Sequence, residues 1–347
     1  MVRTGAFGYI KWGYEATYGS LAATRDNVFG LEQKASSVTY TNNKIVLSEL
    51  NTVFPLRYAF GQARADVSIA FVLSNPWWLK MIFDTRTPST GGGTIAAPII
   101  YSISTKLMPS FSLEIAHDQA TIDSVRVGKG SVLKSITLSA PVGDVVRCTA
   151  DIAYGTEDST QAIDTTPPTD NISFPYTFAY GKLQVTTPTG TERVLAEVQS
   201  IDLTLNTNAE LLYSVGTGGA NPTGNQPVGA YRKLFELTGR FSLSMADRAD
   251  SPDVTPAGTT MDMLNWIYAQ IGANSQALSA EGATLTLTFD NGLATTAKRA
   301  ITFKLTGVVL DEHSVSIEPN EPIFEDIPFQ ARGITVEAIT DTVTEPA

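Results

Sequence analysis

The sequence has little cysteine and little histidine. Its 347 residues include one cysteine and two histidines. A single cysteine allows no disulfide within the chain and no cysteine-based zinc site, and Cys148 lies in an apolar run that indicates a buried strand. His117 and His313 are far apart and do not have the spacing of a His-Glu-x-x-His motif. We therefore expect no metal site.

Long apolar runs are missing as well. No stretch of 18 residues is apolar throughout, so the sequence predicts no membrane-spanning helix. Residues 1–9 lack the apolar core of a signal peptide. We expect no membrane partner, and a protein that is made in the cytoplasm and stays soluble until it assembles.

Basic residues are scarce. Lys and Arg number 24 against 35 Asp and Glu, which gives a net charge of −11. Such a chain is not expected to wrap nucleic acid, because that binding needs clustered basic residues to neutralise the phosphates. Charged residues make up 17% of the chain and hydrophobic residues 43%. This composition favours a chain that buries much of its surface against other chains.

Motifs for catalysis are also absent. The chain has no Gly-x-Ser-x-Gly nucleophile elbow, and its glycine-rich run at 216–221 has neither the third glycine of a dinucleotide fingerprint nor the Lys-Ser/Thr of a phosphate loop. Acidic residues gather towards the C-terminus, where we interpret them as a solvated rim. They are Asp311, Glu312, Glu318, Glu321, Glu325 and Asp326. We therefore predict no cofactor and a structural role, not an enzymatic one.

What the sequence does contain is alternation. Leu203 and Leu205 belong to a run in which apolar and polar residues alternate, as in a half-buried strand. Residues 31–45 echo this run, with Val38 and Tyr40 in the corresponding positions. A chain of this length suits two domains. The echo predicts that one β-domain is present twice.

Further strands follow the same order in both halves. The expected strands are 31–46, 65–73, 110–117, 132–140 and 145–154, then 176–185, 194–205, 231–244, 283–289, 301–310 and 327–336. A short helix is expected after the strand 65–73 in the first half, with Asn75 as its N-cap, and after the strand 231–244 in the second half, at residues 261–271. Aromatic residues at 5–20 indicate an N-terminal strand over the first domain, or an arm that packs on a neighbouring subunit.

The predicted fold is therefore mainly β, with two tandem β-domains, each flanked by a short α-helix. The expected divisions are an N-terminal arm or strand at 1–30, a first β-domain at 31–155, a linker at 156–173 that is rich in Thr, Asp and Pro, and a second β-domain at 174–347.

Three stretches of the chain resemble the phage tail tube proteins. They begin Trp12-Gly-Tyr-Glu-Ala, Phe174-Pro-Tyr-Thr-Phe and Val315-Ser-Ile-Glu-Pro. Their order and spacing cover most of the chain. The long loops at 87–97 and 216–230 depart from the usual pattern, so loop contacts carry over poorly.

The resemblance implies tail-tube-like β-barrel or sandwich domains and a virion protein. Copies would form rings, and stacked rings would form the hollow tail tube that conducts the viral genome. Six such domains in a ring would require three duplicated chains with pseudo-sixfold symmetry, and a ring of six chains is the alternative. The implied partners are further copies, a tape measure protein, a tail terminator and a sheath. DNA would pass without specific binding, and assembly would occur in the host cytoplasm.

The resemblance also directs attention to particular residues. The polar faces of the two echoing strands are expected to line the bore: Ser37, Thr39, Thr41, Ser200, Asp202, Thr204 and Asn206. Aromatic and loop residues are expected to contact neighbouring subunits: Phe7, Tyr9, Trp12, Tyr14, Gly216, Gly218, Gly219 and Asn221. Because each chain carries a net charge of −11, we expect a net negative bore that repels DNA.

Two other functions fit the sequence less well. The same fold could form the inner tube of a phage-tail-like bacteriocin particle. A glycan-binding or hydrolytic β-sandwich could instead use Trp77 and Trp78 with the acidic residues. Rings or tubes in electron micrographs would favour the tube, and a monomer with affinity for sugars would favour the sandwich.

Overall fold

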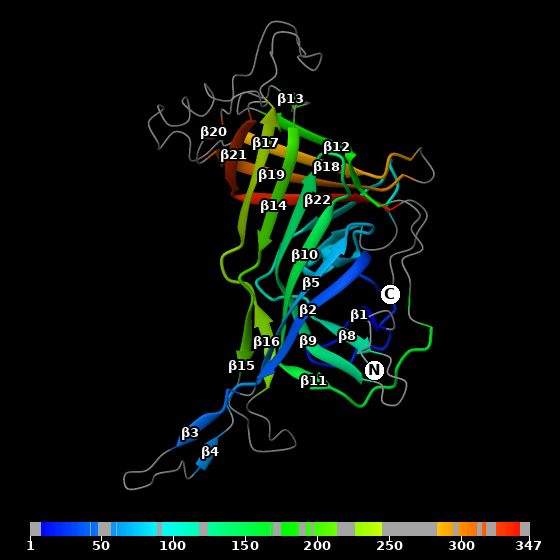
Figure 1. Ribbon diagram of the computed structural model, residues 1–347, viewed down its shortest axis with the longest axis vertical. Helices are drawn as coiled ribbons and strands as arrows, with labels where there is room; N and C mark the ends of the chain where they lie inside the picture. Colours follow the sequence, from blue (N-terminus) through cyan, green and yellow to red (C-terminus); the bar gives the residue numbers. More distant parts are fainter. Residues whose placement is uncertain are drawn as a thin grey trace, which may run out of the picture.

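The computed structural model describes most of the chain. The described residues are 8–41, 43–47, 57–59, 61–88, 92–117, 124–166, 168, 175–186, 192–195, 198–213, 226–244, 283–293, 298–310, 314–316 and 324–340. They are mainly β-strands, which confirms the predicted class (Figure 1). Within these residues no helix has the length and apolarity needed to cross a membrane.

The centre of the molecule is one long antiparallel sheet that runs through both halves of the chain. Its strands in spatial order are β2 (Leu31–Thr41), β5 (Arg64–Val72), β10 (Arg147–Tyr154), the second part of β9 (Ser124–Pro141), β14 (Val198–Asn206), β17 (Glu236–Ser244), β21 (Phe324–Ala331) and β20 (Ser314–Ser316). We call this the long sheet.

Two smaller sheets cover one face of the long sheet. The first cover sheet consists of β1 (Gly8–Tyr14), β8 (Phe111–His117), the first part of β9 and β11 (Thr156–Asp158). The second consists of β13 (Glu192–Leu195), β12 (Thr177–Thr186), β18 (Ala283–Asp290), β19 (Ala300–Leu310), β22 (Gly333–Ile339), β7 (Ile99–Ser102) and β6 (Thr85–Thr87). In Figure 1 the strands of the second cover sheet cross those of the long sheet near the upper end.

The core contains residues from the long sheet and from both cover sheets. A single apolar cluster includes residues of all three. Trp12 of the first cover sheet packs on Phe29 with ring centroids 5.9 Å apart, and Phe29 packs on Phe71 of β5 at 5.6 Å. In the second half Phe241 and Phe329 pack at 6.1 Å. Such tilted aromatic pairs add to the stabilisation that burial provides.

Strand β9 belongs to two sheets because it bends along its length. Gly130 lies where the strand leaves the first cover sheet, and its φ of +65° is one that other residues rarely adopt. A Cβ at this position would also come within 2.8 Å of the Tyr18 ring. From Val132 onward β9 pairs with β10 in the long sheet, and a bulge opposite Asp151 and Ile152 follows within that pairing.

Two hairpins extend beyond the sheets. Each follows the end of a strand of the long sheet: β3 (Ile45–Leu47) with β4 (Arg57–Ala59) after β2, and β15 (Glu210–Tyr213) with β16 (Pro227–Tyr231) after β14. Figure 1 shows β3 and β4 projecting away from the body, while β15 and β16 lie beside it.

The strands pair in the same order in both halves. In the first half the path is β1-β8-β9-β10-β5-β2, and in the second it is β12-β18-β19-β21-β17-β14. The strand after β10 returns to β9, and the strand after β21 returns to β19. The described strands close no barrel in either half, because the long sheet continues from one half into the next.

Several local predictions need correction. The expected first helix is only a 3₁₀ helix, η2 (Trp77–Met81), with Pro76 at its N-cap position and the side chain of Asn75 accepting a hydrogen bond from the Trp77 N–H. The last strand, expected at 327–336, is two strands, β21 and β22. The second helix, expected at 261–271, lies outside the described residues.

Tryptophans 77 and 78 do not form a sugar-binding platform. Trp77 is 7% exposed and Trp78 is fully buried, because η2 packs its apolar residues into the core. The proposed glycan-binding alternative depended on an exposed aromatic pair, and the structure contradicts it. The strand predicted around Cys148 is confirmed, since this residue is buried in β10.

Candidate functional site

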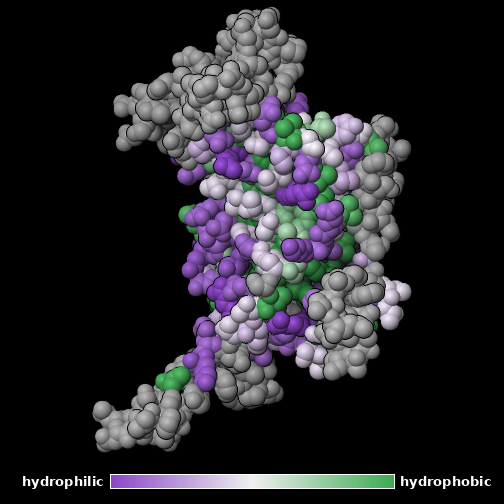
Figure 2. All heavy atoms as spheres, viewed as in Figure 1, coloured by the Kyte–Doolittle hydropathy of each residue, from purple (hydrophilic) through white to green (hydrophobic). Residues whose placement is uncertain are grey.

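The face of the long sheet opposite the cover sheets is polar. Alternation along each strand sends every second residue to this face, and Figure 2 shows hydrophilic residues gathered on the side of the body where β14 and β17 lie. Among the described residues of this face that pair outside the bulges, the charged ones are Lys34, Arg64, Arg147, Arg240, Asp66, Asp151, Asp202, Glu236 and Asp326. Lys134 and Glu32, at bulges, add one charge of each sign. The described face is therefore close to neutral.

Many of these charges pair with one another. Asp66 lies 2.8 Å from Arg64 and 3.3 Å from Lys134, and Arg240 lies 2.9 Å from Asp202. Partial burial favours the neutral form of Asp66, but its contacts with Arg64 and Lys134 outweigh this and lower its pKa. Each exposed pair contributes little to stability. Their main effect is to leave few uncompensated charges on the face.

The residues predicted to line a bore lie on strands of the long sheet. Thr39 and Thr41 are exposed on β2. The four predicted residues of β14 are half-buried and alternate with buried residues along that strand: Ser200, Asp202, Thr204 and Asn206. Ser37 is part of β2, but its side chain lies outside the described part of the chain.

The two halves meet at a seam between β9 and β14. Seven residues of β14 pair with β9 in one antiparallel register, in which Thr204 is opposite Thr137. The hydroxyl oxygens of these two residues lie 3.2 Å apart on the polar face. Just beyond the seam, the Thr207 N–H donates to the carbonyl of Lys134 at 2.8 Å. The seam makes one sheet out of strands from both halves.

The ends of the long sheet are the strands β2 and β20. Within the described residues β2 pairs only with β5, and β20 pairs only with β21. Each strand therefore presents backbone N–H and C=O groups along one side without a strand partner. Such edges pair readily with strands of other chains.

The hairpin of β15 and β16 packs against the first half of the chain. Backbone hydrogen bonds join Met108 to Ala230 at 3.2 Å and Arg232 to Lys106 at 2.7 Å. The Tyr213 hydroxyl donates to the carbonyl of Ala63 at 2.7 Å. A small apolar cluster beneath the hairpin includes Met108, Val132, Ala153, Leu211 and Ala230.

The base of this hairpin is held by a buried guanidinium. Arg232 is 4% exposed and donates to the carbonyls of Ile82 and Thr105. Burial lowers its pKa, and the nearby carboxylate of Asp84 partly offsets the effect. Asp84 in turn accepts hydrogen bonds from the backbone N–H groups of Ser104 and Thr105 at 2.7 and 2.6 Å.

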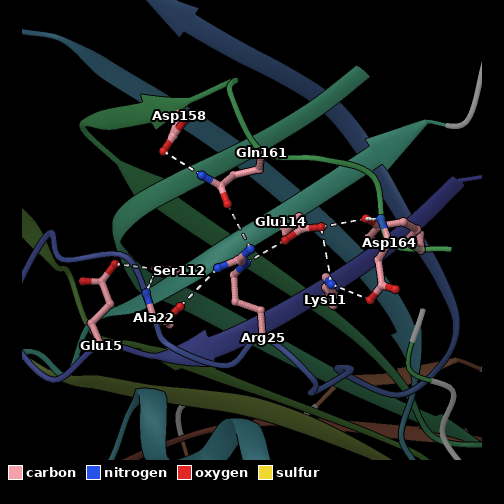
Figure 3. Close-up of polar contacts among 10 residues, drawn as sticks. Lys11, Glu15, Ala22, Arg25, Ser112, Glu114, Asp158, Gln161 and Asp164 are labelled. Carbon is pink, nitrogen blue, oxygen red and sulfur yellow. Dashed lines mark hydrogen bonds and ion pairs between the residues drawn. The ribbon is translucent and has the colours of Figure 1, made fainter. Parts of the chain in front are cut away.

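A network of buried charges lies on the outer face of the first cover sheet (Figure 3). Glu114 is 1% exposed; it lies 3.5 Å from Lys11 and accepts a 2.6 Å hydrogen bond from Arg25. Lys11 also reaches Asp164 at 2.7 Å, and the Arg25 guanidinium contacts Gln161. The segment after β11, which lies in the predicted linker, is therefore bound to the first cover sheet.

The charged groups of this network pair with one another, as expected of a network that stabilises the fold. The Tyr9 hydroxyl donates to Glu114 at 2.7 Å, and burial followed by this hydrogen bond raises the pKa of Tyr9. The hydrogen bond from Lys11 lowers the pKa of Asp164. Among the described residues, no group of three His, Cys, Asp or Glu side chains is placed to hold a metal ion.

Comparison with known proteins assigns the chain to a family. A family model described as phage tail tube protein matches residues 5–331, nearly the whole chain. The chain belongs to the phage tail tube protein family. No curated protein matches it. Membership of this structural family implies a virion component of the tail that assembles with itself and with other tail proteins, and it favours a non-enzymatic role.

In this tail tube protein, the described aromatic residues that were predicted to contact a neighbour, Tyr9, Trp12 and Tyr14, all have partners within the chain. Residues 8–14 form β1, so the N-terminal segment is a strand over the described part and not an arm. Trp12 is fully buried and offers no surface to a neighbour, which corrects the contact predicted for it. Tyr14 donates its hydroxyl proton to the Trp77 carbonyl at 2.6 Å, and Tyr9 joins the buried network. Phe7 and residues 214–225, with Gly216, Gly218, Gly219 and Asn221, lie outside the described residues.

Sequence reasoning missed the two hairpins of the tail tube protein and the seam that joins its halves. One local signal marks the hairpins. Asn43 and Asn208 each lie two residues beyond a strand of the long sheet, and both have positive φ, of 40° and 47°. Asparagine tolerates this left-handed conformation better than most residues. An asparagine at the same place in both halves predicts a turn there.

Proposed function

We propose that the protein is the subunit of a hollow tail tube, in which its copies form rings and stacked rings conduct the viral genome into the host. One observation carries this proposal. The two free edges of the long sheet correspond to the two strands that already pair at the seam inside the chain. The seam is thus a template for contacts between chains.

The correspondence rests on a duplicated domain. The strand pairings in the two halves agree residue by residue around the hairpins: Ile45 faces Ala59 as Glu210 faces Tyr231, and Asn43 corresponds to Asn208. On this alignment β2 is the counterpart of β14, and β20 continues β19 as the counterpart of the second part of β9. We propose one domain at 31–155 and its copy at 174–347, preceded by 1–30 and connected by 156–173.

The template gives a register for the contact between chains. Within the chain Thr204 faces Thr137 and Leu203 faces Leu138. The counterpart of Thr204 is Thr39, and the counterpart of Thr137 is Ser314, since Asp326 and Thr149 correspond on the neighbouring strands. We expect Thr39 of one chain to face Ser314 of the next. Pairing in this register satisfies both edges.

The size of the ring favours three chains. The described residues of each chain contribute eight strands to the long sheet, so three chains give 24 strands and six give 48. With a strand spacing of about 4.8 Å and a tilt of about 40°, the backbone diameters would be about 48 Å and about 96 Å. The narrower ring leaves a side-chain lining around one double helix, whereas the wider ring would enclose much empty space.

The polar face of the long sheet is the proposed lining of the bore. Its described charges nearly cancel, so we propose a neutral lining in place of the net negative one expected from composition. Neutral pairs such as Arg240 with Asp202 give DNA phosphates few free cations to bind. DNA would therefore pass without specific binding.

The remaining partners follow from this role. A tube of stacked rings needs a tape measure, a tail terminator and, in a contractile tail, a sheath, with assembly in the host cytoplasm. The same subunit contacts would serve an injection tube of bacteriocin type. Virions that contain this protein in their tails would favour the phage tube over that alternative.

Electron microscopy of the purified protein and of virions tests the proposal. We expect rings and tubes whose averaged end views show threefold symmetry with six similar lobes. Sixfold symmetry with twelve lobes would overturn the three-chain ring, and a protein that stays monomeric at high concentration would overturn the tube.

A cysteine pair tests the register of the contact. In the double variant Thr39→Cys/Ser314→Cys, mild oxidation of assembled tubes should link neighbouring chains, because residues directly opposite in antiparallel strands lie within disulfide reach. Thr41→Cys/Ser316→Cys is the matched control, since its positions would be four residues out of register. Linking of the control pair but not of the test pair would contradict the register. Cys148 is buried and should not compete.

A further inference from the structure

The two hairpins have the same construction but different surroundings. Val46 faces Tyr58 in the β3–β4 hairpin as Leu211 faces Ala230 in the β15–β16 hairpin. Val46 is 51% exposed, whereas Leu211 is 8% exposed. Leu211 is covered because its hairpin packs on the first half of the same chain. The β3–β4 hairpin projects away from the body (Figure 1).

The surface beneath Leu211 is a pair of buried residues on β9 and β10. Val132 faces Ala153 across the two strands, and both are nearly inaccessible to solvent, at 0% and 2% exposed. They belong to the apolar cluster that contains Leu211 and Ala230. The hairpin therefore covers a surface that would otherwise be open to water.

Among the described residues of the second half, the counterpart of this pair has no such hairpin over it. Val309 faces Gln330 on β19 and β21, next to the pair of Leu310 with Phe329. In the first half Val132 and Ala153 are likewise next to the pair of Leu133 with Ile152. Val309 is 37% exposed and Gln330 is exposed. Val309 is thus an accessible apolar residue in the position where Val132 is covered.

We propose that the β3–β4 hairpin of one chain packs over Val309 and Gln330 of the neighbouring chain in the ring. This inference rests on the proposed ring, in which β2 of one chain lies beside β20 of the next. That placement brings the hairpin after β2 to the neighbour's Val309, as the hairpin after β14 is brought to Val132. The contact covers Val46 and Val309 together and removes both from water.

The occupant is a second copy of this chain. The contact already has a copy within the chain, where the same hairpin register, the same turn residue and the corresponding two-residue surface occur together. Gln330 occupies in the second half the position that Ala153 has in the first. The proposed site between chains is therefore more polar than the site within the chain. A more polar site suits a contact that must also be soluble before assembly.

Chemical crosslinking in assembled tubes tests the contact. In Val46→Cys/Val309→Cys tubes, a short bis-maleimide should convert the monomer band on a denaturing gel into a ladder of linked chains. The pair Leu211→Cys/Val132→Cys should link only within a chain and calibrates the reach of the reagent. Val46→Cys/Leu234→Cys is the matched control between chains, because Leu234 is 73% exposed and is not part of the proposed site.

The crosslinking results distinguish a failure of the hairpin contact from a failure of the proposed tube function. Tubes in which the internal pair links but the Val46 and Val309 pair does not would overturn the hairpin contact and leave the tail tube function standing. A protein that forms no rings would overturn both.

A charged variant provides a second measurement. Val46→Asp should reduce the yield of tubes while leaving the melting temperature of the monomer unchanged, because Val46 is exposed in the single chain. Leu211→Asp should lower the melting temperature of the monomer, because Leu211 is an apolar residue that is already buried within the single chain. An unchanged yield of Val46→Asp tubes would contradict the proposed contact.

Discussion

Single residues on the first cover sheet show how strongly this fold depends on paired buried charges. Glu114 has almost no contact with water and is held by Lys11, Arg25 and Tyr9. Moving a carboxylate into such a place is costly unless cations and hydrogen bonds compensate it. The network therefore makes the position of the segment after β11 specific, since that segment supplies Asp164 to Lys11.

Removal of Lys11 should be costly. Lys11→Met keeps much of the apolar stem but leaves Glu114 and Asp164 short of a cation, so we expect a loss of about 3–5 kcal/mol in unfolding free energy. Denaturant unfolding of the monomer measures it. Lys304→Met is the matched control, because its pair with Glu337 is partly exposed and should cost about 0–1 kcal/mol. Equal losses in the two variants would contradict this account.

Asp84 gives the hairpin contact a dependence on pH. Burial raises its pKa, but hydrogen bonds from Thr105 and Ser104 outweigh burial and lower the pKa below its usual value. Its stabilising contribution is therefore fully present above the unfolded pKa of about 4 and is lost as pH falls through the lower folded value. Asp84→Asn should lower stability at pH 7 and flatten the loss of stability below about pH 4. Melting temperatures across this range provide the test, and a wild-type slope in the variant would contradict it.

At the scale of single residues, the sequence predicted those features that depend on residues nearby in the chain. The strand around Cys148 follows from its apolar neighbours. Trp12 was expected at a surface because its segment shows no steady period, yet it is buried against Phe29 and against Phe111, which is 99 residues away in the sequence. Lys11 and Glu114 are about as far apart, and nothing local marks them as partners.

Among the elements, the β15–β16 hairpin depends on close backbone contact. Pro227 lies so near Gly155 that a Cβ at Gly155 would come within 2.1 Å of its ring. The absence of a side chain at Gly155 therefore permits the hairpin to approach the end of β10.

Gly155→Ala should loosen this approach. The added methyl group cannot be accommodated without a backbone shift, and we expect a loss of about 1–3 kcal/mol. Limited proteolysis should then cut the hairpin faster. Gly229→Ala in the same hairpin is the control, because a Cβ there has no neighbour within 4 Å. Equal cleavage of the two variants would count against the contact.

The strands were largely predictable and the connections were not. Alternation located the strands of the long sheet because one face is apolar and the other polar. The apolar run at 77–83 suggested a helix, but its residues are buried by packing from all sides, and only a 3₁₀ turn forms. The hairpins are short strands whose burial depends on a remote surface, so their own sequence shows no clear period.

At the scale of the whole molecule, the two halves are joined more tightly than two domains on a linker. They share the seam of β9 with β14 and the pairing of β7 with β22. One apolar cluster contains residues of both halves. The sequence predicted the repetition of strands, but the seam pairs residues whose contact no local pattern specifies.

The shared sheet predicts cooperative unfolding. Because neither half can lose its strands without breaking the seam, differential scanning calorimetry of the monomer should show one transition, with calorimetric and van't Hoff enthalpies in agreement. Two well-separated transitions would show that the halves unfold independently and would contradict the coupling.

The seam between β9 and β14 also has a consequence for assembly. A three-chain ring would contain six such junctions, and three of them, one in each polypeptide, would form during folding, before any encounter with another molecule. Of the three contacts between chains, two would then carry the entropic penalty of bringing separate bodies together, and the third would close the ring. Since each chain has one β2 end and one β20 end, growth of the proposed ring would be head-to-tail, and closure after the third chain would leave no edge for a fourth.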